Sequence, residues 1–131
     1  MIVSDASALL DLLLRRPAAS DIQARVEAEL ALHAPHLVDT EVLHALRRWV
    51  ARGDLAPRRA QEALEDLADL PLVRYPHPPL SARVWSLRER LSAYDATYVA
   101  LAEGLGAALL TADRRLARGA AGIAPLLDVS R

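Results

Sequence analysis

The sequence predicts an α/β protein, a three-layer α/β/α sandwich with a central, mainly parallel sheet. Short apolar segments alternate along the chain with longer amphipathic segments, which is the pattern of parallel strands joined by covering helices. The chain has 131 residues, of which 53% are hydrophobic, and this is enough to build one buried core. We therefore expect a single domain over residues 1–131.

The start of the chain predicts one strand followed by two helices. The apolar residues 1–3 have the length of a short buried strand, and a helical run over residues 8–15 ends before Pro17. Apolar residues at intervals of four, separated by charged ones, then predict an amphipathic helix over about residues 20–33.

The next segment predicts a second strand and two more helices. Residues 36–38 form the apolar strand, and Asp39 and Thr40 offer an N-cap for a helix that ends near residue 53. Pro57 suits the first turn of another helix.

The rest of the chain continues the alternation of strands and helices. Strands are expected at residues 71–75, 106–110 and 125–129, and helices at about 80–91, at 93–103 before Gly104, and directly after Asp113.

The composition excludes several classes of function. All 16 basic residues are arginine, so P-loop and Schiff-base chemistry, which need lysine, are excluded, and a receiver domain would lack its phosphate-sensing lysine. Cysteine is absent, and the net charge of −1 gives no overall basic field of the kind that marks many nucleic-acid-binding proteins. The longest apolar run, residues 8–14, contains Asp11 and is too short to span a membrane. We expect a soluble, cytoplasmic protein without a signal peptide.

Four acidic residues lie where apolar segments give way to helices: Asp5, Glu41, Asp95 and Asp113. Three of them follow predicted strands, and parallel α/β sheets bind ligands at the carboxyl ends of their strands. Asp95 instead lies in the first turn of a helix, at the top of its buried face. Carboxylates gathered in one pocket repel one another unless a cation neutralises them. Oxygen ligands without cysteine favour Mg²⁺ or Mn²⁺.

Helix capping is the alternative explanation for each acid taken alone. Asp5 and Asp113 could cap the helices that follow them, and Ser92 with Asp95 resembles a capping box. Glu41 is the exception, because Asp39 and Thr40 are better caps. Capping does not require that the acids share one end of the sheet. The placement of several acids at that same end therefore favours the metal site.

The chain resembles a PIN domain, specifically the small stand-alone kind exemplified by VapC toxins of type II toxin–antitoxin systems. The resemblance covers essentially the full length and is carried by four stretches: Val3-Ser-Asp5-Ala-Ser7, Asp39-Thr-Glu41-Val-Leu-His, Tyr94-Asp95-Ala-Thr-Tyr98-Val-Ala-Leu-Ala102 and Leu109-Leu-Thr111-Ala-Asp113-Arg-Arg. Asp5, Glu41, Asp95 and Asp113 match the acidic quartet of the family, and Ser7 and Thr111 match its accompanying hydroxyls. Arginines in place of further acids after Asp113 indicate that Asp113 acts at longer range.

This resemblance implies hydrolysis of RNA phosphodiester bonds by water activated on Mg²⁺ or Mn²⁺, with the four acids as metal ligands. Arg114 and Arg115 are candidates for holding the substrate phosphate, and at least one of them should face the site. Arg47 and Arg48 are weaker candidates, and His44 is not needed as a base. The resemblance also implies a homodimer and a VapB-like antitoxin.

Two alternatives to the nuclease stay open. One is a catalytically silent PIN-fold module for protein binding or scaffolding. The other is a receiver domain, which the missing lysine and the fourth acid argue against. With only 4% aromatic residues, a base-stacking platform for passive RNA binding is not evident, and this favours the nuclease.

Overall fold

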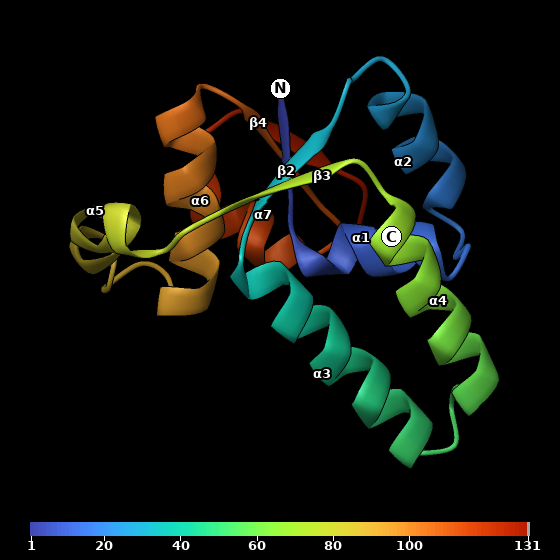
Figure 1. Ribbon diagram of the computed structural model, residues 1–131. Coiled ribbons are helices and arrows are strands. Elements are labelled where there is room, and N and C mark those ends of the chain that lie inside the picture. The colour runs from blue at the N-terminus through green and yellow to red at the C-terminus, as the bar shows by residue number, and fades with distance from the viewer. Residues whose placement is uncertain (131) are drawn as a thin grey trace.

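A five-stranded parallel sheet forms the centre of the protein in the computed structural model, which describes residues 1–130 (Figure 1). The strands are β1 (Ile2–Ser4), β2 (Leu32–Pro35), β3 (Leu72–Tyr75), β4 (Ala108–Thr111) and β5 (Leu126–Asp128). Their order across the sheet is β3-β2-β1-β4-β5, and all neighbours run parallel. The chain therefore starts at the middle strand, winds outward to β3 and then returns to fill the other side.

Helices cover both faces of the sheet. They are α1 (Ala6–Leu13), α2 (Ala19–Val26), α3 (Leu37–Ala51), α4 (Pro57–Asp69), α5 (Ser81–Ser86), α6 (Ala93–Leu105) and α7 (Arg114–Ala120), with a short 3₁₀ helix η1 (Pro78–Leu80) before α5. Helices α1 to α4 contact one another on one face, and α5 to α7, whose connections run in the opposite direction, lie on the other (Figure 1). The predicted three-layer sandwich is confirmed. Within residues 1–130 no helix is long and apolar enough to cross a membrane.

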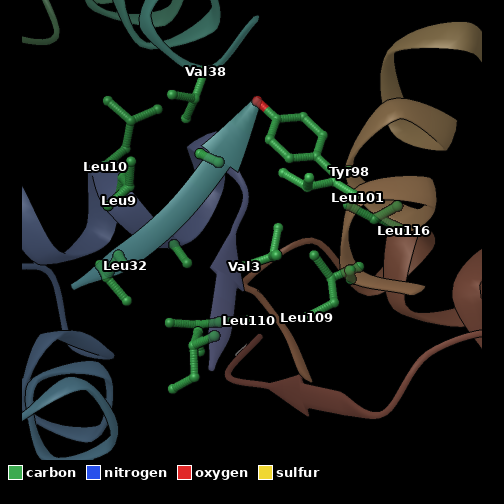
Figure 2. Packing of buried hydrophobic residues seen from close by; sticks show 14 of the residues in the cluster. Val3, Leu9, Leu10, Leu32, Val38, Tyr98, Leu101, Leu109, Leu110 and Leu116 are labelled. Carbon is green, nitrogen blue, oxygen red and sulfur yellow. The ribbon is translucent and has the colours of Figure 1, made fainter. Parts of the chain in front are cut away.

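The core is packed on both sides of the central strands. Val3, Leu109 and Leu110 have no exposed surface, and Figure 2 shows them between the helical layers. Val3 pairs with Leu109 in the register of β1 and β4. Because the carboxyl ends of β1 and β4 extend directly from this core, side chains that follow them start from a rigid base.

The strand predicted at residues 36–38 is wrong. The ladder ends where the His36 N–H donates to the carbonyl of Tyr75, and α3 begins at the next residue. Val38, Val42 and Leu46 are buried at intervals of four, so they form the core-facing stripe of a helix. The strand is instead the preceding segment, β2.

Two predicted helices are too long. The helix predicted over residues 20–33 ends at Val26, and Leu30, at 98% exposed, takes no part in an apolar stripe. The helix predicted over residues 80–91 is broken at Leu87, whose backbone leaves the helical conformation at φ −95° and ψ 5°. Both errors have the same cause. Apolar residues continue at helical spacing beyond the end of each helix, but in the structure they lie in turns.

Helix α6 continues past Gly104, its predicted end, and is capped by Gly106 in the left-handed conformation at φ 63°. Gly106→Ala should therefore lower the free energy of unfolding by about 1 kcal/mol, because a Cβ is strained in this conformation. Gly104→Ala, at a helical position with open space around the added Cβ, should raise it by about 0.5–1 kcal/mol. Urea unfolding of the two variants checks the opposite signs, and equal signs would contradict this helix end.

Candidate active site

Asp5 follows β1 directly and caps α1. Its carboxylate accepts the Ala8 N–H at 2.9 Å, so the predicted capping role is real. Only 4% of the residue is exposed, and this burial raises the pKa of Asp5 from 3.8 to about 6 against the lowering effect of its hydrogen bonds. A carboxylate used only as a cap would gain nothing from such burial.

Two hydroxyl groups fix the orientation of the Asp5 carboxylate. The Thr111 hydroxyl donates to it at 2.5 Å, and the Ser7 hydroxyl lies 2.7 Å and 2.9 Å from its two oxygens. Ser7 in turn accepts the Ala112 N–H, and Thr111 accepts the Asp113 N–H, each at 2.9 Å. The network ties the end of β4 to the start of α1 through Asp5.

Asp95 lies in the first turn of α6, where the Ser92 hydroxyl caps the helix by accepting the Asp95 N–H at 3.1 Å. Its carboxylate is 3.2 Å from the guanidinium of Arg115 on α7. Burial raises the pKa of Asp95, while Arg115 lowers it and Asp113 raises it. Arg115 thus acts as a counter-ion for a carboxylate that is 14% exposed.

Glu41 lies in the second turn of α3, and its carboxylate accepts a hydrogen bond of 2.5 Å from the Tyr98 hydroxyl. Burial raises the pKa of Glu41, the Tyr98 hydrogen bond lowers it and Asp95 raises it again. The prediction that Asp39 caps this helix is wrong, because the N-cap position of α3 is His36. Asp39 pairs with Arg74 through two contacts of 2.6 Å and 2.8 Å.

The N-terminus of α3 is held from outside the helix. The N-cap position, His36, makes no side-chain capping bond, and the ring nitrogen Nε2 of His77 accepts the Leu37 N–H at 2.9 Å. No role for His77 could be predicted from the sequence, because a cap that comes from 40 residues away leaves no local pattern.

Asp113 is the cap of α7. Its carboxylate accepts the N–H groups of Arg115 and Leu116 at 2.9 Å and 3.3 Å, and its side chain is 34% exposed. The guanidinium of Arg115 lies 3.6 Å from it. Asp113 is the more exposed of the two carboxylates that Arg115 contacts.

All four predicted acids line one cavity of about 570 Å³ at the carboxyl end of the sheet. Ser7 and Arg115 also line it, as does Arg48 of α3, a weaker candidate from the sequence. Two residues of α6 that sequence reasoning did not assign to the site, Tyr94 and Tyr98, line it as well. His44 lies in the wall as well, whereas Arg114 points toward Ser130, 3.5 Å away, and Arg47 is outside. One arginine of each predicted pair therefore lines the cavity: Arg48 of Arg47 and Arg48, and Arg115 of Arg114 and Arg115.

The chemistry of these donors fits a hard divalent cation. All are oxygens, and burial together with the neighbouring carboxylates raises the pKa of Asp5, Glu41 and Asp95. Within residues 1–130, however, no three histidine or acidic side chains are grouped closely enough to hold a metal ion. Each carboxylate is instead held by a protein partner: hydroxyls for Asp5, Tyr98 for Glu41 and Arg115 for Asp95.

Comparison with known families matches the chain to the PIN domain over residues 2–122. The chain belongs to the PIN-domain family. It is 47% identical to VapC ribonuclease Mb0985 of Mycobacterium bovis. This alignment has 133 positions and covers both chains completely. It is 44% identical to Ribonuclease VapC1 of Mycobacterium tuberculosis, over 88% of this chain and 87% of that protein. The predicted resemblance is confirmed.

Two solved structures share this fold. The crystal structure of PAE2754 from Pyrobaculum aerophilum has a TM-score of 0.70 and 28% identity over 98% of this PIN domain and 83% of that chain. That of VapBC2 from Rickettsia felis, bound to a DNA fragment from its promoter, has a TM-score of 0.72 over 98% of both chains. With 12% identity, the second likeness shows the fold alone.

Proposed function

We propose that this PIN domain is a Mg²⁺- or Mn²⁺-dependent endoribonuclease, the toxin of a type II toxin–antitoxin pair. The observation that carries the proposal is that Asp5, Glu41, Asp95 and Asp113 line one cavity although they are spread over most of the chain. Full-length relatives at 47% identity that are named as VapC ribonucleases support RNA as the substrate. From the resemblance to VapC ribonucleases we also propose a VapB-like antitoxin as partner and a homodimer.

Asp5, Glu41 and Asp95 would hold the cation, with Asp113 at longer range. A bound divalent cation would lower the pKa of its water and neutralise the charge that develops on the phosphate. Thr111 and Ser7 keep the Asp5 carboxylate oriented toward the cavity, so this ligand is preorganised. The guanidinium of Arg115, 69% exposed at the mouth of the site, would bind the substrate phosphate.

The test is cleavage of a panel of structured RNAs by the purified protein with Mg²⁺ or Mn²⁺. We expect cleavage that EDTA abolishes and that Asp95→Asn lowers by at least about 100-fold. Glu65→Gln, an exposed acid on α4, is the matched control and should cleave like the wild type. A wild type that cleaves nothing would overturn the proposal.

One observation favours the silent-module alternative: the guanidinium of Arg115, 3.2 Å away, already serves as the counter-ion of Asp95. A scaffold would keep this contact permanently. Mn²⁺ titration separates the two functions, because the nuclease must bind the ion through Asp95 and a scaffold need not.

Arg48 should contact the RNA, and Arg47 should not. Both are exposed neighbours on α3, but only Arg48 lines the cavity, two turns beyond Glu41. Arg48→Ala should raise KM about 5- to 10-fold and lower the salt dependence of RNA binding by about one ion, since it removes one phosphate contact. Arg47→Ala is the matched control and should stay within about 2-fold. Equal effects of the two substitutions would show that only overall charge matters.

A further inference from the structure

Tyr98 brings a hydroxyl group to the acidic cavity from the buried face of α6. Its side chain is 1% exposed, and Figure 2 shows the ring among the apolar core residues with its oxygen at the carboxyl end of β2. Tyr98 follows Asp95 by three residues, so both lie on the same side of α6. The ring is therefore fixed by core packing, and only its hydroxyl reaches the site.

The hydroxyl of Tyr98 has one evident partner in the site, the carboxylate of Glu41. The separation of 2.5 Å is that of a charge-assisted O–H···O⁻ bond. A carboxylate can only accept, so the Tyr98 hydroxyl is the donor of this bond. The bond connects α6, which carries Asp95, with α3, which carries Glu41.

Glu41 needs such a support more than the other carboxylates do. Asp5 is short and is held by two hydroxyls and a backbone N–H, and Asp95 pairs with Arg115. Glu41 has a longer side chain and projects from the side of a helix rather than from its first turn. Within the described residues 1–130, no backbone N–H donates to its carboxylate. Without an anchor its carboxylate would sample several rotamers.

We propose that Tyr98 is a positioning residue that holds the Glu41 carboxylate in the cavity. The proposal rests on the proposed function in one respect: Glu41 is taken as a ligand of the divalent cation. Tyr98 itself does not touch the substrate or the ion. It acts through Glu41, as a second layer of hydrogen bonds supports metal ligands in general.

Tyr98→Phe tests this, because it removes the hydroxyl and leaves the ring in the core. We expect Mn²⁺ affinity, measured by calorimetry, to fall about 10- to 100-fold and kcat to fall by a similar factor with KM nearly unchanged. Tyr75→Phe is the matched control: its hydroxyl bonds His33 at 2.8 Å on the sheet, away from the cavity. It should leave both quantities within about 2-fold of the wild type.

A double-mutant cycle on Mn²⁺ affinity shows whether Tyr98 acts through Glu41. In a Glu41→Ala background, Tyr98→Phe should have almost no further effect. An equal effect in both backgrounds would assign Tyr98 to packing and overturn the proposal. If Tyr98→Phe does not fold, Glu41→Asp is the second variant: its side chain is shorter by one methylene group, so we expect it to lose the Tyr98 hydrogen bond and to show the same loss. Wild-type affinity in that variant would overturn the proposal.

A metal-free crystal structure of Tyr98→Phe provides a readout that needs neither activity nor metal binding. The Glu41 carboxylate should leave its wild-type position, and an unchanged position would overturn the proposal. If the wild type cleaves no RNA, the proposed function fails while this structure still decides the role of Tyr98. If the wild type cleaves and Tyr98→Phe binds Mn²⁺ normally, only the positioning role fails.

Discussion

Asp5→Asn should abolish RNA cleavage and at the same time make the metal-free protein more stable. We expect cleavage to fall by about 10³-fold or more, because the amide loses the negative charge that a divalent cation requires. The fold should survive, since asparagine caps helices as well as aspartate does and can still accept the Ala8 N–H.

The gain in stability follows from the burial of Asp5. The shift of its pKa from 3.8 to about 6 means that ionising this buried carboxyl opposes folding by about 3 kcal/mol at pH 8. Asparagine avoids this cost but makes weaker hydrogen bonds with Thr111 and Ser7, so we expect a net gain of about 1–3 kcal/mol. Active-site residues of enzymes commonly lower the stability of the fold while they are needed for activity, and Asp5 is expected to do both.

Asp113→Asn is the matched control, because it makes the same change at another helix cap. Asp113 is 34% exposed in its side chain, so its charge is solvated and the free energy of unfolding should change by less than about 0.5 kcal/mol. Urea unfolding at pH 8 with EDTA compares the two variants. An Asp5→Asn protein less stable than the wild type would contradict the cost assigned to the buried charge.

The sheet could be predicted from the sequence where local signals agree. β1 and β4 are short apolar runs that end at a polar residue, and the strand-to-helix turn after each contains an acid that caps the next helix. The segment at residues 36–38 fails this test, because an apolar pair belongs equally well to a strand or to a helix stripe. In the structure this segment is helical, and Val38 packs in the core as part of the apolar stripe of α3.

The membership of the site could be predicted, but its contacts could not. The positions of Asp5, Asp95 and Asp113 at the starts of helices are local features that the sequence contains. The bonds from Tyr98 to Glu41 and from Arg115 to Asp95 join different helices, and one of them spans 57 residues. Such pairs depend on how α3, α6 and α7 are placed around the sheet, which periodicity does not specify.

Without divalent cations, the stability of the wild type should fall as the pH rises from about 4 to about 7. A carboxyl whose folded-state pKa lies above its unfolded value stabilises the fold below the unfolded pKa, and this contribution is lost as the pH rises through the folded pKa. For Asp5 these values are 3.8 and about 6, so the loss reaches about 3 kcal/mol near pH 7. Raised pKa values of Glu41 and Asp95 act in the same direction.

Urea unfolding in EDTA across this pH range measures the slope, and Asp5→Asn isolates the share of Asp5. Exposed acids with lowered pKa, Glu103 and Asp128, act in the opposite direction but are present in both proteins. The wild-type curve should therefore fall relative to the variant curve as the pH rises. Parallel curves would show that Asp5 titrates normally in the folded protein.

Mn²⁺ should reverse this loss of stability, and only where the carboxylates are ionised. A cation that binds the folded protein stabilises it by about 2.7 kcal/mol at 100 times its Kd. Because protons compete for Asp5, the rise in Tm on adding Mn²⁺ should be several degrees at pH 8 and nearly absent at pH 5. Asp5→Asn should show no rise at either pH. The buried carboxyl that opposes folding in the free protein would then be the group through which the metal stabilises it.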